Sequence, residues 1–166
     1  MWLEKGEARL VREISNLCTS VTVWGGIWYP GRTQLDIVEG NINAKKYIEV
    51  LRDYLLPSIP TSALFLFQQD NAPPHKPISV RHFLHTHAVR LLDPYPANSP
   101  DFNPIEHVWS WMVREVNKSR PSNHASLVKA VENAWQALPQ SVIQAYIDNL
   151  PAQLVKVERA GRARLN

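Results

Sequence analysis

Two periods of apolar residues alternate along this sequence and divide it into strands and helices. Residues Val21 to Tyr29 are rich in β-branched and aromatic side chains, Pro30-Gly31 is a turn signal, and Thr33 to Val38 alternates between polar and apolar side chains. This pattern predicts a β-hairpin over 21–38. Residues 1–20 have no clear period, and the mixed-charge segment from Glu7 to Ile14 is compatible with either a helix or a strand.

Helical spacing begins after Asn43, a residue type that caps helix N-termini, and continues to Pro57. The remaining predicted elements are a strand over 63–67 that is apolar on both faces, a short helix containing Val80, a strand over 89–92, a proline-rich loop over 93–104, and three helices that begin near Asn103, Asn123 and Ser141. The apolar stripe of the helix after Asn103 comprises Ile105, Val108, Trp109, Met112, Val113 and Val116. This order predicts an α/β fold with helices on both faces of a mixed sheet.

Composition limits the function classes without choosing one. The 166 residues are 45% hydrophobic, which is enough for one domain with a buried core. No apolar run reaches membrane length, the first residues lack the apolar core of a signal peptide, and Cys18 is the single cysteine. We therefore expect an intracellular protein that is not secreted and has no membrane partner. The expected division is a poorly readable segment 1–20, one domain over 21–155 and a basic tail over 156–166.

Two carboxylates stand out by their positions. Asp70 ends the predicted buried strand, and Glu106 lies in the first turn of a helix, about 100° around the axis from Ile105. Such a pair can hold a hard cation such as Mg²⁺, which takes oxygen ligands and keeps several waters. The alternatives are structural: Asp70 can shape a turn before Pro73, and Glu106 can cap its own helix.

The sequence motifs around these two acids resemble those of a known family. Residues 68–75 (Gln-Gln-Asp-Asn-Ala-Pro-Pro-His) and 98–109 (Asn-Ser-Pro-Asp-Phe-Asn-Pro-Ile-Glu-His-Val-Trp) closely resemble the two signature stretches of Tc/mariner transposases. Residues 21–27 and 39–43, with Tyr47, resemble the hairpin and helix that precede them in that family. The resemblance runs from about Trp2 to Gly161, nearly the whole chain.

The resemblance implies a ribonuclease-H-like fold and a DDE active site, in which Asp, Asp and Glu hold two Mg²⁺ ions, with Mn²⁺ as a possible substitute. Asp70 matches the second acid and Glu106 the third; positions 71 to 105 lie between them, one residue more than the 34 usual in the family. Family members hydrolyse a phosphodiester at the transposon end and then drive the freed 3′ hydroxyl into target DNA. The implied partners are transposon-end and target DNA, a homodimer is possible, and the implied location in a eukaryote is the nucleus.

The first acid of the family has no counterpart in this chain. In the family it lies upstream of the hairpin on the first central strand, and Trp2 with Gly6-Glu7 resembles the segment after that strand. We therefore expect a chain truncated at its N-terminus whose sheet lacks the first central strand, unless residues 7–15 fill its place or the sheet closes up. Asp36 lies on the wrong strand to substitute and is interpreted as an ordinary strand residue.

Two functional hypotheses follow from the incomplete acid set. The first is a DDE transposase catalytic domain that is inactive or nearly so, with weak or absent metal binding. The second is a transposon-derived protein that binds nucleic acid or a partner without cutting, and a weaker third is a nuclease of the same fold acting on another substrate.

Other chemistry-bearing residues favour structural roles. His82, His85 and His87 are interpreted as a solvated helix face rather than a zinc site, and His75 and His107 as neighbours of the acids that could contact substrate phosphate. The scattered cations that could meet DNA phosphates are Lys45, Lys46, Lys76, Arg81, Arg114, Lys118 and Arg120, with Arg159, Arg162 and Arg164 in the tail. Most tryptophans are expected in the core.

Overall fold

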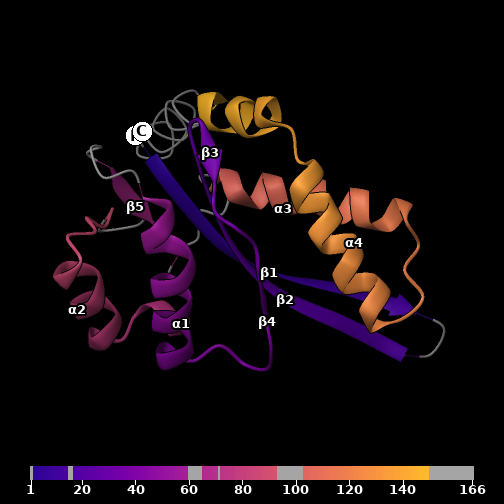
Figure 1. Ribbon diagram of the computed structural model, residues 1–166, viewed down its shortest axis with the longest axis horizontal. Coiled ribbons are helices and arrows are strands. Elements are labelled where there is room, and N and C mark those ends of the chain that lie inside the picture. The colour runs from indigo at the N-terminus through magenta and orange to yellow at the C-terminus, as the bar shows by residue number, and fades with distance from the viewer. Residues whose placement is uncertain (1, 15–16, 60–64, 71, 93–102, 150–166) are drawn as a thin grey trace, which may run out of the picture.

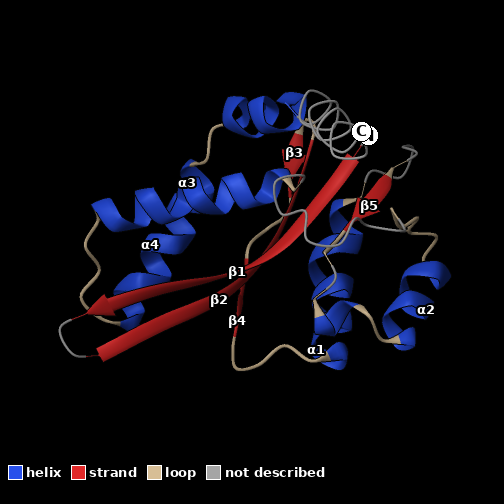
Figure 2. Cartoon of the chain, turned by 180° about the vertical axis from the view of Figure 1, so that it is seen from behind, coloured by secondary structure: helices blue, strands red, loops and turns tan. Residues whose placement is uncertain are grey.

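The computed structural model describes residues 2–14, 17–59, 65–70, 72–92 and 103–149. A mixed five-stranded sheet lies between two layers of helices (Figures 1 and 2). The strands are β1 (Trp2–Ile14), β2 (Leu17–Trp28), β3 (Gly31–Arg32), β4 (Asp36–Val38) and β5 (Leu66–Gln68). Their order is β3-β2-β1-β5, and β4 pairs with β2. The α/β architecture predicted from the sequence is confirmed.

The centre of the sheet is filled by β1. This strand pairs antiparallel with β2, from Leu3 opposite Trp28 to Ile14 opposite Leu17, and parallel with β5, from Trp2 opposite Leu66 to Glu4 opposite Gln68. Residues 2–14 thus occupy the position where the sequence led us to expect a missing strand, and this corrects the expected gap. Backbone pairing needs no particular side chain, so a segment without any aspartate can satisfy both neighbouring strands.

The predicted hairpin is present, with its return strand in two pieces. β3 pairs with the end of β2 and β4 with its middle, both antiparallel. Between the two pieces, the Thr33 amide donates to the Gly26 carbonyl at 2.8 Å, and the Thr33 hydroxyl accepts from the Gly26 amide at 2.9 Å. The side chain replaces a ladder partner at this point, which keeps the hairpin closed where its regular pairing stops.

One face of the sheet is covered by the first helical layer (Figure 1). Helix α1 (Ala44–Val50) begins at Asn43, whose side chain accepts from the Lys46 amide as predicted. It continues through a π-helical turn (Leu51–Leu55) and a 3₁₀ turn (Leu56–Ser58), and α2 (Ile78–Thr86) lies beside it. The core between this helical layer and the sheet includes the buried residues Trp24, Tyr47, Leu51, Leu55, Phe67, Val80 and Leu84.

The second layer consists of α3 (Pro104–Lys118), α4 (His124–Ala137) and a helix over 140–149. Trp109 and Trp135 stack here at 5.5 Å between ring centroids, directly over Gly25 of β2. The predicted stripe of α3 is buried except for Val113, which is 40% exposed. Val113 lies about 80° around the helix from Ile105, at the edge of the stripe, so including it was wrong.

The strand predicted over 63–67 is β5 in its described part, while 60–64 and the loop 93–102 lie outside the described residues. Phe67 makes two backbone hydrogen bonds to residues 90–92. Its amide donates to the Arg90 carbonyl at 2.7 Å, and its carbonyl accepts from the Leu92 amide at 2.9 Å. The strand predicted over 89–92 is thus reduced to one parallel bridge, from Phe67 to Leu91. Across the described residues, every helix is too short or too polar to cross a membrane.

Candidate metal centre

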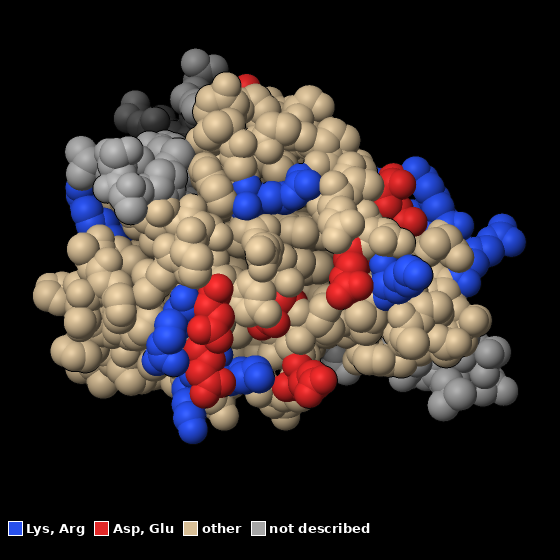
Figure 3. Space-filling model, in the orientation of Figure 1, with Lys and Arg blue, Asp and Glu red and all other residues tan. Residues whose placement is uncertain are grey.

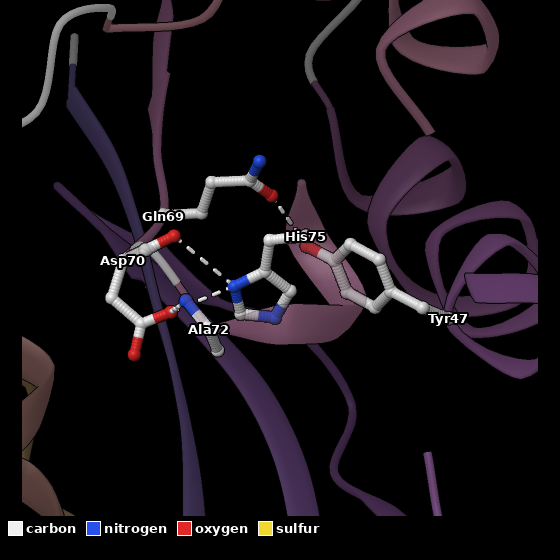
Figure 4. A network of polar contacts seen from close by, with 5 residues as sticks. All are labelled: Tyr47, Gln69, Asp70, Ala72 and His75. Atoms are coloured by element: carbon white, nitrogen blue, oxygen red, sulfur yellow. Dashed lines mark hydrogen bonds and ion pairs between the residues drawn. The ribbon is translucent and has the colours of Figure 1, made fainter. Parts of the chain in front are cut away.

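Asp70 lies two residues beyond β5, where the buried strand gives way to a turn. Gln68 is only 3% exposed, whereas the Asp70 side chain is 42% exposed, so the chain emerges from the core at this point. The Asp70 Oδ1 atom accepts a hydrogen bond from the Ala72 amide at 3.0 Å (Figure 4). This is an Asx turn, and it holds the carboxylate at the edge of the sheet.

The second contact of the Asp70 carboxylate is with His75. Its Nδ1 atom lies 2.7 Å from Asp70 Oδ1 and 3.2 Å from the Asp70 carbonyl oxygen (Figure 4). The imidazole is almost fully buried, with a side-chain exposure of 1%. The ring is turned inward to the acid and away from solvent, so His75 is a neighbour of Asp70 that is not placed to contact a phosphate.

The ring of His75 is supported by Tyr47 of α1, with the ring centroids 4.5 Å apart. The Tyr47 hydroxyl donates to Gln69 Oε1 at 2.7 Å, and Gln69 is the neighbour of Asp70 (Figure 4). The sequence analysis did not predict this contact. A signal was available, since a buried tyrosine hydroxyl requires a polar partner.

Glu106 approaches Asp70 from the first turn of α3. This helix begins after Asn103, with Pro104 in its first turn as predicted, and the Asn103 side chain makes no cap hydrogen bond. Burial raises the pKa of the Glu106 carboxyl above its ordinary value, and the negative charge of Asp70 raises this pKa further. The two acids therefore share one electrostatic environment although they come from opposite ends of a long connection.

Two carboxylates that influence each other's charge are a suitable donor set for one divalent cation. Mg²⁺ is typically held by one or two carboxylates together with waters and substrate phosphates. Within the described part of the chain, no group of three or more His, Cys, Asp or Glu side chains is arranged to hold a metal ion. Asp70 and Glu106 thus have the donor chemistry that a hard cation would require.

Asp36 belongs to a different environment. It lies on β4, where burial raises its pKa, while a hydrogen bond from Tyr54 and the charge of Lys46 oppose that increase and the charge of Asp53 adds to it. Neither Asp70 nor Glu106 is among the groups that shift it. This agrees with its interpretation as an ordinary strand residue.

His82, His85 and His87 are all exposed, which agrees with a solvated helix face, whereas the ring of His107 packs within the fold. His87 lies on the Phe83 ring at 4.3 Å, with its Nδ1 atom 2.8 Å from the Phe83 carbonyl oxygen, and the described residues hold no zinc-like group around it. His107 stacks on Tyr146 at 5.0 Å, and its Nε2 atom is buried, which leaves that atom no access to a phosphate.

The surface charge is mixed. Figure 3 shows lysine and arginine side chains beside aspartate and glutamate at several places on a visible face that is otherwise mostly uncharged. This view supports the expectation of a solvated surface with both signs of charge, and it displays no continuous basic stripe.

Comparison with known proteins identifies a consistent set of relatives. A family profile described as DDE superfamily endonuclease matches residues 1–129. The Tc1 transposase of Caenorhabditis elegans is 36% identical over 136 residues, covering 80% of this chain and 49% of the relative. The Tc3 transposase of the same organism is 32% identical over 145 residues, covering 84% of this chain and 44% of the relative. The chain thus spans about half the length of the curated relatives it matches.

Solved structures agree on the fold. The catalytic domain of Mos1 mariner transposase superimposes with a TM-score of 0.74 at 20% identity, covering 91% of this chain and 77% of that one. The same domain with raltegravir and Mg also gives a TM-score of 0.74, at 21% identity, with 91% and 78% covered. The ribonuclease-H-like fold expected from the sequence is therefore confirmed.

Proposed function

This chain belongs to the DDE superfamily endonucleases, as a catalytic domain of the Tc/mariner transposase type, and from this premise we propose that Asp70 and Glu106 form a divalent-metal centre for phosphodiester chemistry on DNA. The observation that carries the proposal is the shared electrostatic environment of the two acids. Burial raises the pKa of Glu106, and the charge of Asp70 raises it further, which supports a site shared by the two carboxylates.

The two side chains have distinct duties in this proposal. Asp70 offers a carboxylate already oriented by the Ala72 amide and His75. The pKa of Glu106 is raised first by burial and then by the charge of Asp70, so its carboxylate would be stabilised by a bound cation. A bound Mg²⁺ or Mn²⁺ ion supplies Lewis-acid stabilisation of the charge that develops on the phosphate oxygens. The bond formed joins a water oxygen to phosphorus, and the bond broken releases a 3′ hydroxyl.

The proposed activity of this chain by itself is low. Two ions about 4 Å apart stabilise the attacking and the leaving oxygens together, and a ligand shared between them keeps that spacing. Asp70 and Glu106 account for one ion, and the described residues supply no third member of the set. We infer that the chain binds one divalent cation and DNA phosphate, and that cleavage and strand transfer belong to the parent transposase activity.

Solved structures of Mos1 transposase include a strand transfer complex and a paired-end complex with Mn. By analogy, the proposed partner of this chain is transposon-end and target DNA, with a second copy of the chain as a possible companion. In a eukaryotic cell the proposed location is therefore the nucleus.

The test is a nicking assay on supercoiled plasmid with Mg²⁺ or Mn²⁺, with the cation's dissociation constant measured in parallel. Wild type is expected to bind about one Mn²⁺ per chain and to nick slowly or not at all, and Asp70→Asn and Glu106→Gln are expected to lose the ion. Robust turnover that Asp70→Ala abolishes would overturn the low-activity claim. Salt-sensitive DNA binding without any Mn²⁺ binding, unchanged in both variants, would instead indicate a non-enzymatic nucleic-acid-binding protein.

A further inference from the structure

We propose that His75 is a positioning residue of the metal centre, which fixes the side-chain rotamer of Asp70 by holding its Oδ1 atom. This inference rests on the proposed role of Asp70 as a metal ligand. It assigns a specific duty to a buried histidine whose position in the sequence suggested only proximity to the acids.

The first step is the direction of the hydrogen bond. The Nδ1 atom of His75 faces Asp70 Oδ1 at 2.7 Å and the Asp70 carbonyl oxygen at 3.2 Å. A carbonyl and a carboxylate oxygen are both acceptors, so Nδ1 must carry the hydrogen and donate it. The Ala72 amide donates to the same Oδ1 atom at 3.0 Å. Oδ1 therefore receives two protein donors, while the second oxygen of Asp70 points away from His75 (Figure 4).

The second step is that the imidazole itself cannot swing. His75 ends a 3₁₀ turn (Pro73–His75) in which its amide donates to the Ala72 carbonyl at 2.9 Å. Its side chain is 1% exposed and lies against the Tyr47 ring. Tyr47 is fully buried and bonded to Gln69. Asp70 thus contacts His75, His75 contacts Tyr47, and Tyr47 contacts Gln69. Because Gln69 precedes Asp70 in the sequence, these contacts form a closed ring.

The closed ring of contacts orders Asp70 before a cation arrives. A ligand that is already held in its binding rotamer loses less conformational entropy on metal binding than one that must be ordered at that moment. Supporting residues that orient metal ligands typically change metal affinity by about 10–100-fold when they are replaced. This range sets the expected effect of removing the His75 donor.

The chain offers a matched pair of variants at one position. In His75→Asn the side-chain amide nitrogen stands as many bonds from Cβ as Nδ1, so it can donate to Asp70 Oδ1. In His75→Gln the amide lies one bond further, where Nε2 was, and the donor to Oδ1 is lost. Mn²⁺ affinity, measured without DNA by calorimetry or electron paramagnetic resonance, should stay within about threefold in His75→Asn and fall by about 10–100-fold in His75→Gln.

Two readouts do not depend on metal binding. Crystal structures should show one Asp70 rotamer in wild type and His75→Asn, and a different or divided rotamer in His75→Gln. Nitrogen-15 spectra of the wild-type imidazole should show a protonated Nδ1, a measurement that stands even if a variant does not fold.

The proposal is overturned if Nδ1 of wild type is unprotonated, or if folded His75→Gln keeps both the wild-type rotamer and the wild-type Mn²⁺ affinity. If wild type binds no Mn²⁺ at all, the proposed metal function fails. The rotamer and tautomer results then still decide whether His75 positions Asp70.

Discussion

Asp70 supports a turn and, by proposal, a metal ion, and two substitutions at this one position separate the two roles. Asp70→Asn keeps a side-chain oxygen where Oδ1 accepts from the Ala72 amide and from His75, but it removes the charge. Asp70→Ala removes both the acceptor and the charge. A purely structural aspartate predicts that the milder variant is harmless to every measurement, whereas a metal ligand predicts that metal binding is lost in both.

The magnitude follows from the two contacts. The hydrogen bond from the Ala72 amide contributes about 1 kcal/mol. The bond from His75 involves a charged acceptor and is worth about 1.5–3 kcal/mol, and we take the lower end because the Asp70 side chain is 42% exposed. Asp70→Ala should therefore lower the free energy of unfolding by about 2–3 kcal/mol, since it also leaves the buried His75 donor without this acceptor. Asp70→Asn should cost less than about 1 kcal/mol.

The assay is urea unfolding without metal, paired with Mn²⁺ titration of the folded variants. If Asp70→Asn is as destabilised as Asp70→Ala, the two-donor geometry at Oδ1 is not the source of the stability. If Asp70→Asn binds Mn²⁺ as wild type does, the turn alone explains the residue and the assignment of Asp70 as a metal ligand fails.

Three further substitutions test other parts of the structure. Because burial and the charge of Asp70 raise the pKa of Glu106, wild-type stability without metal should fall as pH rises from the unfolded pKa through the higher folded pKa. Glu106→Gln should remove that fall and lose Mn²⁺, as urea unfolding across pH and metal titration can show. Gly25→Ala should cost about 1–3 kcal/mol in urea unfolding, because a Cβ there would lie 2.8 Å from the buried Trp135 ring; an unchanged midpoint would contradict this packing. Arg32→Met should lower the free energy of unfolding by about 1–2 kcal/mol, because the guanidinium donates to the Leu138 and Gln136 carbonyls at the end of α4. If Arg32→Lys is as stable as wild type, the two hydrogen bonds of the guanidinium are unimportant.

Local signals predicted most of the helices and the hairpin. Asn43 caps α1 through its side chain, and Asn123 forms a capping box with Ser126, because a cap depends only on residues within one turn. The strand over residues 2–14 could not be predicted in the same way. Its conformation is decided by β2 and β5, which offer it two edges from distant parts of the chain, and strand preference depends on such partners.

The candidate site shows the same difference between local signals and long-range packing. The sequence motifs around Asp70 and Glu106 identified both acids. The inward turn of His75 could not be read there, because the choice between solvent and Asp70 depends on how Tyr47 packs over the ring. Motifs thus report which residue types are present, whereas their mutual orientation is set by tertiary packing.

The position of β1 separates what the fold requires from what the chemistry requires. The family resemblance implies that the first acid comes from the strand beside β5, and in this chain that strand contributes Trp2, Leu3 and Glu4 to the pairing. A sheet can form from any residues whose backbone groups pair. A site for two metal ions, however, needs a carboxylate at a defined position. Similarity of fold therefore predicts no activity by itself, and metal stoichiometry is the sharper quantity. One Mn²⁺ per chain agrees with two acids, whereas two per chain would require a third carboxylate.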